Sequence, residues 1–291
     1  MKKLKALFFI TLALSLIFLS SLNAQTDTCS TKYPIVLVHG ISYRDNVPIK
    51  KYWGKIPDYL EKNGAKVFIA NVDALGTIES NAVILKKIIL QISETEKCQK
   101  VNIIAHSKGG LDSRYMLAKL KMADYVASLT TVSTPHHGSI WANLALYSVY
   151  CSGIEDFAEK ASYFWAFILN DENPDPMKAY NELTTNEMNI LNNLIPDVEN
   201  VYYQSYGSYL KNEYPSFMMK YRNKTINEYD GLNDGVVPVS SFQWTNFKGF
   251  AGENNYFGVS HFDIIGFTNI TFFDEKTFFR DIVADLKNSG F

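Results

Sequence analysis

A serine at position 107 stands among small residues in the run Ala105-His106-Ser107-Lys108-Gly109-Gly110. An apolar run precedes it and a helix-like pattern follows it, so a strand turns into a helix at the serine. Small residues two positions before and after the serine let the strand and the helix approach closely and expose the hydroxyl on a strained corner. The usual form is G-x-S-x-G, and here Ala105 replaces the first glycine. The pattern predicts a nucleophilic Ser107; the alternative is a Ser-Gly helix cap in an ordinary βα unit.

A serine hydroxyl needs a base to become a nucleophile at neutral pH. In chains with this strand-serine-helix turn, the order is serine, then an acid, then histidine. The sequence contains His39, His106, His136, His137 and His261. Only His261, in GVSHFDIIG, lies late enough to follow an acid that itself follows Ser107. His261 is therefore the predicted general base; as a structural histidine it would leave the serine without one.

The acid that orients this base must lie between the serine and the histidine. The candidates are Asp197, Asp230 and Asp234. Asn-Asp-Gly is a tight-turn sequence, and it places Asp234 on a loop in GLNDGVVPVSS. Asp230, in EYDG, is the rival. We predict Asp234 as the third member of the triad.

Acyl transfer also needs hydrogen-bond donors for the oxyanion. One donor is the backbone N–H after the nucleophile, which belongs to Lys108. The second comes from a loop after an early strand, and VLVHGIS supplies the N–H of Ile41 there. Gly40 permits the turn that aims this amide inward. His39 is then expected to hold the loop.

Alternating elements position these residues. Apolar runs at 33–40, 65–72, 100–105, 127–133 and 200–207 are predicted strands, and residues 52–64, 79–94, 110–120 and 274–290 are predicted helices. Strands that are almost continuously apolar and alternate with helices indicate an α/β fold with a mostly parallel sheet covered on both faces. With no repeat and no low-complexity linker, residues 25–291 are predicted to form a single domain.

The alternation breaks after the fourth predicted strand. Residues 139–196 are helical and rich in aromatic side chains, with no clear strand. Aromatic residues at helical spacing are usually core. Because the sheet is already covered, this insertion is instead predicted to cover an apolar cleft.

The N-terminus predicts export. Residues 1–24 have three lysines, a short apolar run and a small residue at Ala24, which is typical of a signal peptide cleaved after Ala24. The alternative is an uncleaved membrane anchor. The mature protein is expected to be secreted or periplasmic, and export permits one disulfide among Cys29, Cys98 and Cys151, with the pair left open.

The charge balance excludes one class of partner. The formal net charge of the whole chain is −2, and loss of the three N-terminal lysines leaves 25 basic against 30 acidic residues, a net charge of −5. A mildly acidic chain lacks the basic footprint of nucleic-acid binding. No cysteine or histidine spacing indicates a zinc or redox motif, and no organic cofactor is expected.

The chain resembles secreted bacterial triacylglycerol lipases of the α/β-hydrolase superfamily. The resemblance covers most of residues 33–270 and rests on YPIVLVHG, YWGKIPDYLEKNGAKVFIANV, KVNIIAHSKGGLDSRY, TTVSTPHHGS, NELTTNEMNILNN, NDGVVP and SHFDIIG. It implies the triad Ser107, Asp234 and His261. It also implies a lipase or esterase that acts on lipid or ester substrates at an oil–water interface, with residues 140–170 of the insertion at about 140–196 as a mobile lid.

The same resemblance implies one structural calcium near the catalytic histidine. An aspartate two residues after that histidine is a ligand in the family, and Asp263 matches it. The second ligand is not assigned, because the usual motif around it is missing from residues 209–229. A turn cap or salt bridge is the alternative role of Asp263. The sequence does not indicate whether a folding chaperone is required.

Other functions remain open at this point. Within the enzyme class the rivals are a short-chain carboxylesterase, a phospholipase and a thioesterase. A catalytically inactive binding module is the alternative outside it, since a fold does not by itself establish function. A structural or adhesive surface protein is a third possibility that export permits.

Overall fold

The computed structural model describes residues 27–45, 50–211 and 213–291. The predicted signal peptide, residues 1–24, lies outside these residues. Among the helices that are described, none combines the length and the apolar character needed to cross a membrane.

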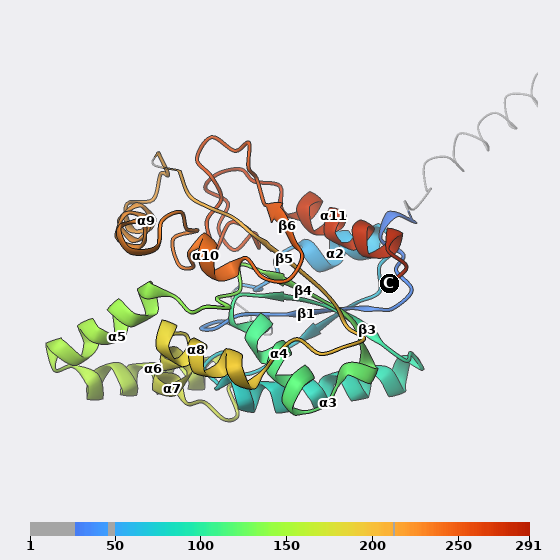
Figure 1. Cartoon of the computed structure of the whole chain (residues 1–291), viewed down its shortest axis with the longest axis horizontal. Helices are drawn as coiled ribbons and strands as arrows, with labels where there is room; N and C mark the ends of the chain where they lie inside the picture. Colours follow the sequence, from blue (N-terminus) through green and yellow to red (C-terminus); the bar gives the residue numbers. More distant parts are fainter. Residues whose placement is uncertain (1–26, 46–49, 212) are drawn as a thin grey trace, which may run out of the picture.

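A six-stranded parallel sheet forms the centre of the molecule (Figure 1). Its strands are β1 (Ile35–Val38), β2 (Val67–Ala70), β3 (Val101–His106), β4 (Val126–Val132), β5 (Tyr202–Gly207) and β6 (Phe247–Phe250), in the spatial order β2-β1-β3-β4-β5-β6. Every neighbouring pair is parallel. Every residue of β1, β3 and β4 is buried, which is why these strands read as continuous apolar runs. The predicted α/β architecture is confirmed.

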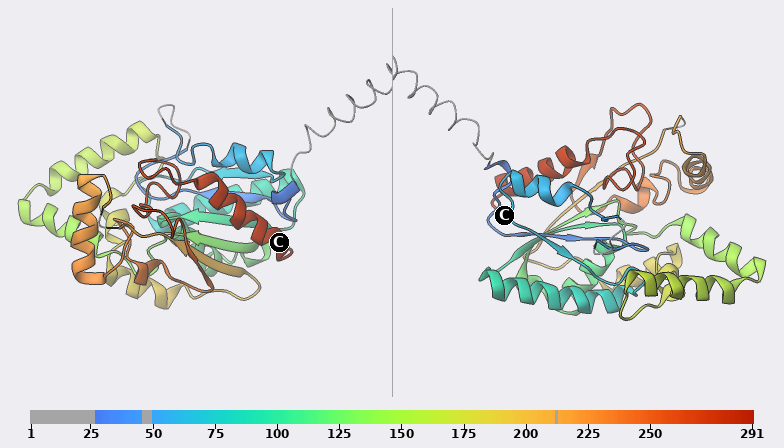
Figure 2. Two further views of the ribbon diagram at one scale, coloured as in Figure 1. Left: turned by 90° about the horizontal axis from the view of Figure 1, so that it is seen from above. Right: turned by 180° about the vertical axis from the view of Figure 1, so that it is seen from behind.

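Helices cover both faces of the sheet (Figures 1 and 2). Helices α2 (Ile56–Lys62) and α11 (Glu275–Asn288) lie on one face, and α3 (Ile78–Glu96) and α4 (Lys108–Lys119) lie on the other. Alternate residues of β1 point to the two faces, so Leu37 joins the α2–α11 core and Val38 joins the α3–α4 core. The carboxyl ends of the strands therefore meet at one edge, held between two packed layers.

The remaining helices lie mostly beyond this edge. They are α5 (Ile140–Ser152), α6 (Glu155–Leu169), α7 (Pro176–Asn181), α8 (Thr185–Leu194), α9 (Phe217–Asp230) and α10 (Val239–Phe242), and two short 3-10 helices, η1 (Asp27–Cys29) and η2 (Ala123–Tyr125), complete the described elements. Figures 1 and 2 show α5 and α6 projecting from one end of the molecule. Residues 139–196 contain no strand, as predicted.

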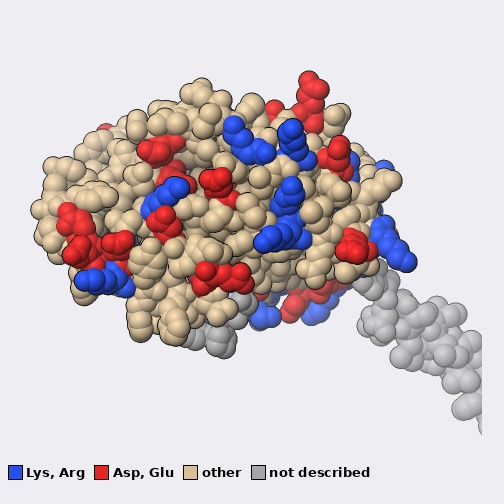
Figure 3. Space-filling model, turned by 90° about the horizontal axis from the view of Figure 1, so that it is seen from below, with Lys and Arg blue, Asp and Glu red and all other residues tan. Residues whose placement is uncertain are grey.

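Exposed apolar side chains gather on the projecting helices. Most of the large exposed side chains of α5 and α6 are aromatic: Tyr147, Tyr150, Phe157, Tyr163, Phe164, Trp165 and Phe167. On the face seen in Figure 3, lysines and arginines are interspersed with acidic residues and separated by uncharged areas. Helices α5 and α6 therefore present a group of exposed aromatic side chains at one end of the molecule.

Two features differ from the sequence predictions. Strand β6 and helices α9 and α10 were not predicted, because β6 has only four residues with no apolar run and α9 follows no clear stop signal. The disulfide that export would permit is not formed, since Cys29, Cys98 and Cys151 are all free. They lie in different settings, since Cys29 is buried under α11 whereas Cys151 is exposed at the end of α5.

Candidate active site

Ser107 occupies a strained corner between β3 and α4. Its φ is 54° and its ψ is −133°, outside the regions that L-residues ordinarily adopt. The glycines behind it allow close packing: a Cβ on Gly109 would lie 2.4 Å from the carbonyl oxygen of His39, and one on Gly110 would lie 2.2 Å from Oγ1 of Thr134. The small residues of the motif are thus required by contacts with backbone and side chains on both sides.

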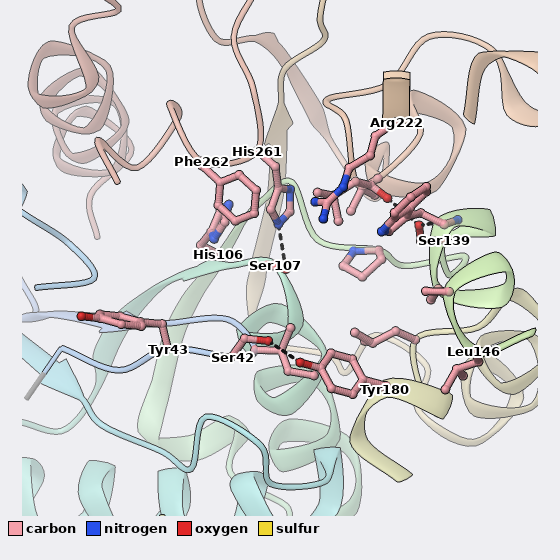
Figure 4. Close-up of a pocket in the computed structure, with 18 of the residues that line it drawn as sticks. Ser42, Tyr43, His106, Ser107, Ser139, Leu146, Tyr180, Arg222, His261 and Phe262 are labelled. Carbon is pink, nitrogen blue, oxygen red and sulfur yellow. Dashed lines mark hydrogen bonds between the residues drawn. The ribbon is translucent and has the colours of Figure 1, made fainter. Parts of the chain in front are cut away.

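A continuous hydrogen-bonded chain joins the three predicted catalytic side chains. Nε2 of His261 lies 3.0 Å from Oγ of Ser107 (Figure 4), and Nδ1 of His261 lies 2.7 Å from Oδ2 of Asp234. The three side chains come from positions far apart in the sequence, and all three are buried. This arrangement can remove the serine proton as the hydroxyl attacks an electrophile.

A tight turn fixes the acid. Oδ1 of Asp234 accepts hydrogen bonds from the backbone N–H groups of Val236 and Val237, at 2.9 and 2.7 Å. Gly235 has a φ of 87°, which the Asn-Asp-Gly sequence supplies. The backbone N–H of His261 also donates to the carbonyl oxygen of Asp234. One carboxylate oxygen is therefore held by the turn, which leaves the other for the histidine.

The rival acids lie elsewhere. Asp230 is exposed at the end of α9. Asp197 accepts hydrogen bonds from the indole of Trp244 and the hydroxyl of Thr245. Neither carboxylate contacts His261, so the structure brings together only Asp234 of the three candidates.

The predicted oxyanion donors flank the serine. Lys108 is the first residue of α4, directly after Ser107. Gly40 approaches the nucleophile so closely that a Cβ there would lie 2.7 Å from Cβ of Ser107, and Ile41 follows it in the pocket wall. Lys108 and Ile41 thus both lie next to the nucleophile, and the role of their amides as oxyanion donors stays a prediction.

Three other histidines have structural surroundings. His39 lies between the carbonyl oxygens of Gly40 and Val72, and burial lowers its pKa to about 4. His136 is buried and stacks on Trp244, and His137 lies beside the same indole. His39 thus holds the loop before Ile41, as its position predicts.

Tyr52 and His106 form a part of the site that the sequence did not reveal. The hydroxyl of Tyr52 lies 2.6 Å from Nδ1 of His106 and accepts a hydrogen bond from the N–H of Gly40. Burial raises the pKa of Tyr52 well above its usual value, so its phenol stays protonated and donates to His106. The ring of His106 in turn contacts the ring of His261, with centroids 4.5 Å apart. The only sequence signal was the position of His106 directly before Ser107.

The surroundings of Asp263 do not fit a calcium ion. Hydroxyl groups donate to its two oxygens, Thr268 to Oδ1 and Tyr214 to Oδ2, each at 2.6 Å. Calcium requires six to eight oxygen ligands, usually with several carboxylates. Within the part of the chain that the structure describes, no group of three acidic, histidine or cysteine side chains is arranged to hold a metal. Asp263 is instead saturated by hydroxyl donors that precede and follow the His261 loop.

A cavity of about 490 Å³ opens in front of Ser107 and is mostly apolar (Figure 4). Its apolar lining includes Ile41, Tyr43, Trp141, Ala142, Ala145, Leu146, Val149, Ala158, Met177, Leu183, Val236, Val237, Phe262, Ile265 and Phe267. Helices α5, α6 and α7 supply one wall, so the insertion contributes directly to the site. A volume of this size accommodates a small organic molecule or part of a longer chain.

The fold and this constellation define an α/β hydrolase. Residues 34–228 match the family model described as palmitoyl protein thioesterase. Triacylglycerol lipase 2 of Saccharomyces cerevisiae is 30% identical over 236 residues, which are 79% of this chain and 67% of that protein. A triacylglycerol lipase of Burkholderia plantarii is 37% identical, but the match covers 41% of this chain and only about a third, 34%, of the relative.

Solved structures agree in fold. The Staphylococcus hyicus lipase has a TM-score of 0.67 at 18% identity, and the match covers 89% of this chain and 98% of that one. The mature Bacillus licheniformis lipase has a TM-score of 0.63 at 24% identity, with 87% and 92% covered. The chain belongs to the α/β-hydrolase family that the palmitoyl protein thioesterase model describes, and triacylglycerol lipase 2 of Saccharomyces cerevisiae is a relative of it. The predicted family and the predicted enzyme class, a carboxylic-ester hydrolase, are confirmed.

Proposed function

We propose that this chain hydrolyses lipid esters, triacylglycerols among them, through Ser107, His261 and Asp234. The observation that carries the proposal is the hydrogen-bonded series of these three side chains at the mouth of an apolar cavity. The relatives named triacylglycerol lipase support the substrate class. The geometry is that of a nucleophile, a base and an orienting acid.

In the proposed reaction, Oγ of Ser107 attacks the ester carbonyl while Nε2 of His261 takes the serine proton. Asp234 keeps the proton of His261 on Nδ1 and stabilises the imidazolium that forms. The backbone N–H groups of Ile41 and Lys108 donate to the oxyanion. His261 then protonates the leaving alkoxide, and water, activated by the same histidine, releases the acid from the acyl enzyme.

We further propose that residues 140–170 form a lid within the insertion at about 140–196. Ala158 of α6 lines the cavity, whereas Phe157 on the same helix is 73% exposed. One side of the helix thus faces the substrate site and another faces solvent. Exposed aromatic side chains beside an apolar cavity are suited to contact a lipid surface.

Asp263 has a metal-free role in this proposal. Its hydroxyl partners come from Tyr214 on one side and from Thr268 on the other, and its own N–H donates to Oγ of Ser260. These contacts fix the backbone on both sides of His261. In this proposal the hydrogen-bond network holds the His261 loop in place, which is the role that the resemblance assigned to a calcium ion.

Export is the proposed location. The support is the composition of residues 1–24, with its basic start, apolar run and Ala24. Detection of a processed chain in the culture medium or periplasm, with Gln25 as its first residue, tests this proposal directly.

Thioester hydrolysis is a second candidate, because residues 34–228 match the palmitoyl protein thioesterase model. The same triad chemistry acts on oxygen esters and thioesters, and the two differ only in the leaving group. Comparison of palmitoyl-coenzyme A with p-nitrophenyl palmitate separates them. A preference for the thioester by more than about tenfold in kcat/KM, or about 1.4 kcal/mol, would reassign the natural substrate.

The test of the main proposal is hydrolysis of p-nitrophenyl butyrate and palmitate by the wild type, Ser107→Ala and Ser93→Ala. Ser93 lies on α3, where its hydroxyl donates to the carbonyl oxygen of Cys98. We expect Ser107→Ala to lose about 10⁴-fold or more in kcat and the control to retain full activity. A folded wild type with no turnover on any chain length would instead support the binding-module alternative. Turnover confined to butyrate would support the short-chain esterase.

A further inference from the structure

One cationic side chain enters the otherwise uncharged cavity. Arg222 reaches it from α9, and the lining contains no lysine, aspartate or glutamate. In the view of Figure 4, Arg222 and His261 enter from the upper wall, whereas Ser42 and Tyr180 lie in the lower wall. A permanent charge in an apolar ester-binding cavity is unfavourable unless something compensates it.

No protein group in the described part of the chain compensates this charge. Arg222 forms no hydrogen bond or ion pair there, and its Nε is buried without a partner. Burial lowers the pKa of its guanidinium, with no carboxylate acting in the opposite direction. A buried donor of this kind is costly to leave unsatisfied.

Two arginines that are more fully buried than the partly exposed Arg222 show how this chain treats the terminal nitrogens of such a group, although their Nε atoms also lack a partner. Arg44 lies within 3.6 Å of Asp73 and 3.3 Å of Asp171. Arg114 donates to Asn192 and to the carbonyl oxygen of Ile195. Arg222 alone of the three faces a cavity rather than protein acceptors, which indicates that its partner is a ligand.

Trp141 holds the guanidinium in place. The Cζ atom of Arg222 lies 4.9 Å from the centre of the indole ring of Trp141, which is itself part of the cavity lining. A guanidinium in contact with an aromatic face keeps its N–H groups free along its edge. Those donors form the fork that binds planar or tetrahedral oxyanions in a bidentate manner.

We propose that Arg222 binds the phosphate of a glycerophospholipid, so that the enzyme cleaves an acyl ester of a phospholipid. This inference rests on the function proposed above. Water and the ester give a fatty acid and a lysophospholipid: the bond from the acyl carbon to the glycerol oxygen breaks, and the phosphate stays intact. A neutral triacylglycerol would leave the Arg222 charge without an acceptor.

The position of the reacting carbonyl favours a phosphate over the carboxylate of the released acid. That carboxylate forms from the carbon bonded to Oγ of Ser107, next to the amides of Ile41 and Lys108. An anion beside Arg222 must belong to a different part of the substrate. His261 protonates the leaving alkoxide, so the wall that it shares with Arg222 in Figure 4 is the wall that the alcohol part of the substrate follows.

The test compares two substrates that differ by the phosphocholine headgroup, which carries the phosphate. They are dihexanoyl phosphatidylcholine and 1,2-dihexanoylglycerol, both below their aggregation concentrations, so that surface charge plays no part. The variants are Arg222→Met, Arg222→Lys and, as a matched control, Lys224→Met. Lys224 is an exposed cation on the same helix and is not in the lining of this cavity. Hexyl phosphate and hexanoate are tested as competitive inhibitors.

We expect Arg222→Met to lower the ratio of kcat/KM for the phospholipid to that for the neutral ester by about 10- to 100-fold, since one charge-assisted contact is lost. Arg222→Lys should recover part of this ratio, and Lys224→Met should leave it unchanged. Hexyl phosphate should inhibit the wild type more strongly than hexanoate, and Arg222→Met should remove that difference.

Other results overturn the inference. An equal loss on both substrates would make Arg222 a structural residue. A wild type that cleaves the neutral ester but not the phospholipid would refute the phosphate site and leave the lipase proposal intact. Hexanoate inhibition that depends on Arg222, without a change in phospholipid turnover, would assign Arg222 to product carboxylate. No turnover of either substrate would instead refute the proposed function itself.

Discussion

The corner between β3 and α4 and the α5–α6 pair use apolar residues in opposite ways. Residues 101–114 are buried throughout, and the glycines in this stretch have backbone oxygens or side chains pressed against them. Residues 140–169 contain only three buried positions, and Phe157, Phe164 and Phe167 are 65–79% exposed. The first region is a packed interior, whereas the second is an apolar surface.

This difference separates two requirements of lipid hydrolysis. The nucleophile must be held within a fraction of an ångström of its base, which needs a rigid, close-packed scaffold. A substrate that lies in an oil phase needs an apolar surface to receive it, and such a surface cannot also be a sealed core. The two regions are connected through β4, which pairs with β3 and is joined to α5 by residues 133–139.

Glycine-to-alanine substitutions, one in each region, should differ most in their effects on the free energy of unfolding and on kcat. In Gly109→Ala the new methyl would lie 2.4 Å from the carbonyl oxygen of His39 and 2.7 Å from that of Val38, so the backbone before Ile41 must move. We expect a loss of about 3 kcal/mol in the free energy of unfolding and at least about 100-fold in kcat. Urea denaturation and p-nitrophenyl butyrate hydrolysis measure the two effects.

The matched control is Gly153→Ala, at the end of α5. Gly153 has a φ of 63°, and no atom lies within 4 Å of the position that the alanine methyl would take, so only the backbone conformation opposes alanine. The expected loss is about 1 kcal/mol, with kcat unchanged. Equal effects of the two substitutions would contradict the difference in packing between the regions.

The sequence predicted the rigid region more completely than the exposed one. Ser107, His261 and Asp234 are brought together because the order of elements and the turn motifs are local signals that the parallel sheet converts into proximity. The contacts of Tyr52 with His106, and of Arg222 with Trp141, join residues far apart without any motif. Such side-chain contacts depend on how loops and added helices pack, and periodicity does not report this.

Asp263 is the point where family resemblance and physical fit diverge. The resemblance implied a calcium ligand from one position, but the ion depends on several oxygens at once, and hydroxyl groups occupy both carboxylate oxygens instead. The hydroxyl of Tyr214, 49 residues before Asp263, could not be paired with it by spacing. A ligand set is therefore predictable from sequence only when all of its members carry a recognisable motif.

The Asp263 network gives the next largest expected effect. In Tyr214→Phe the carboxylate loses a 2.6 Å hydrogen bond in a buried site. We expect the free energy of unfolding to fall by about 1–3 kcal/mol. The value of kcat should fall more than KM changes, because the loop that carries His261 loosens. Tyr229→Phe, at an exposed position on α9, is the control.

The metal question has a separate readout. Thermal unfolding of the wild type should give the same Tm with excess EDTA and with added calcium, since the oxygens of Asp263 already accept hydroxyl donors. A rise in Tm with calcium, or greater loss of activity with the chelator than in untreated protein, would restore the calcium ligand role of Asp263.

Exposed aromatic residues should separate stability from activity at a lipid surface. A triple variant of α6, Phe157→Ser with Phe164→Ser and Phe167→Ser, removes apolar side chains that face solvent. We expect an unchanged Tm and unchanged hydrolysis of dissolved p-nitrophenyl butyrate. Turnover of emulsified triolein should fall by about tenfold, because less apolar area is transferred into the oil.

Tyr125→Ser supplies the matched control at the opposite edge of the sheet. Tyr125 is an exposed aromatic residue just before the amino end of β4, away from the cavity at the carboxyl ends. Its loss should leave turnover on the emulsion unchanged. The lid proposal fails if Tyr125→Ser and the α6 variant reduce emulsion turnover equally.

Acid sensitivity should arise from the packed interior that includes the β3–α4 corner, because His39, His106 and His136 are buried, whereas α5 and α6 contain no histidine. Burial lowers the pKa of all three, to about 4 for His39. Below about pH 6.5 these histidines bind protons in the unfolded chain but not in the native protein. The free energy of unfolding therefore falls as the pH drops from 6.5 toward the native pKa values. The fall is about 1.4 kcal/mol per histidine and pH unit. Asp112, Asp171 and Glu182 act in the opposite direction, because burial raises the pKa of each carboxyl, to about 6 for Asp112, and the native protein is then protonated before the unfolded chain.

These histidines and carboxyls together set the slope of wild-type stability between pH 6.5 and 5, and that slope is the reference for the variants. As the pH falls, the free energy of unfolding of His136→Gln should decrease less steeply than that of the wild type, by about 1.4 kcal/mol per pH unit. Urea denaturation at each pH measures it. His137→Gln is the adjacent control: His137 is exposed, so its removal should change the slope far less. If the two variants have the same slope, burial of His136 is not what makes the packed region sensitive to acid, and the contrast with α5 and α6 would have to come from the carboxyl groups instead.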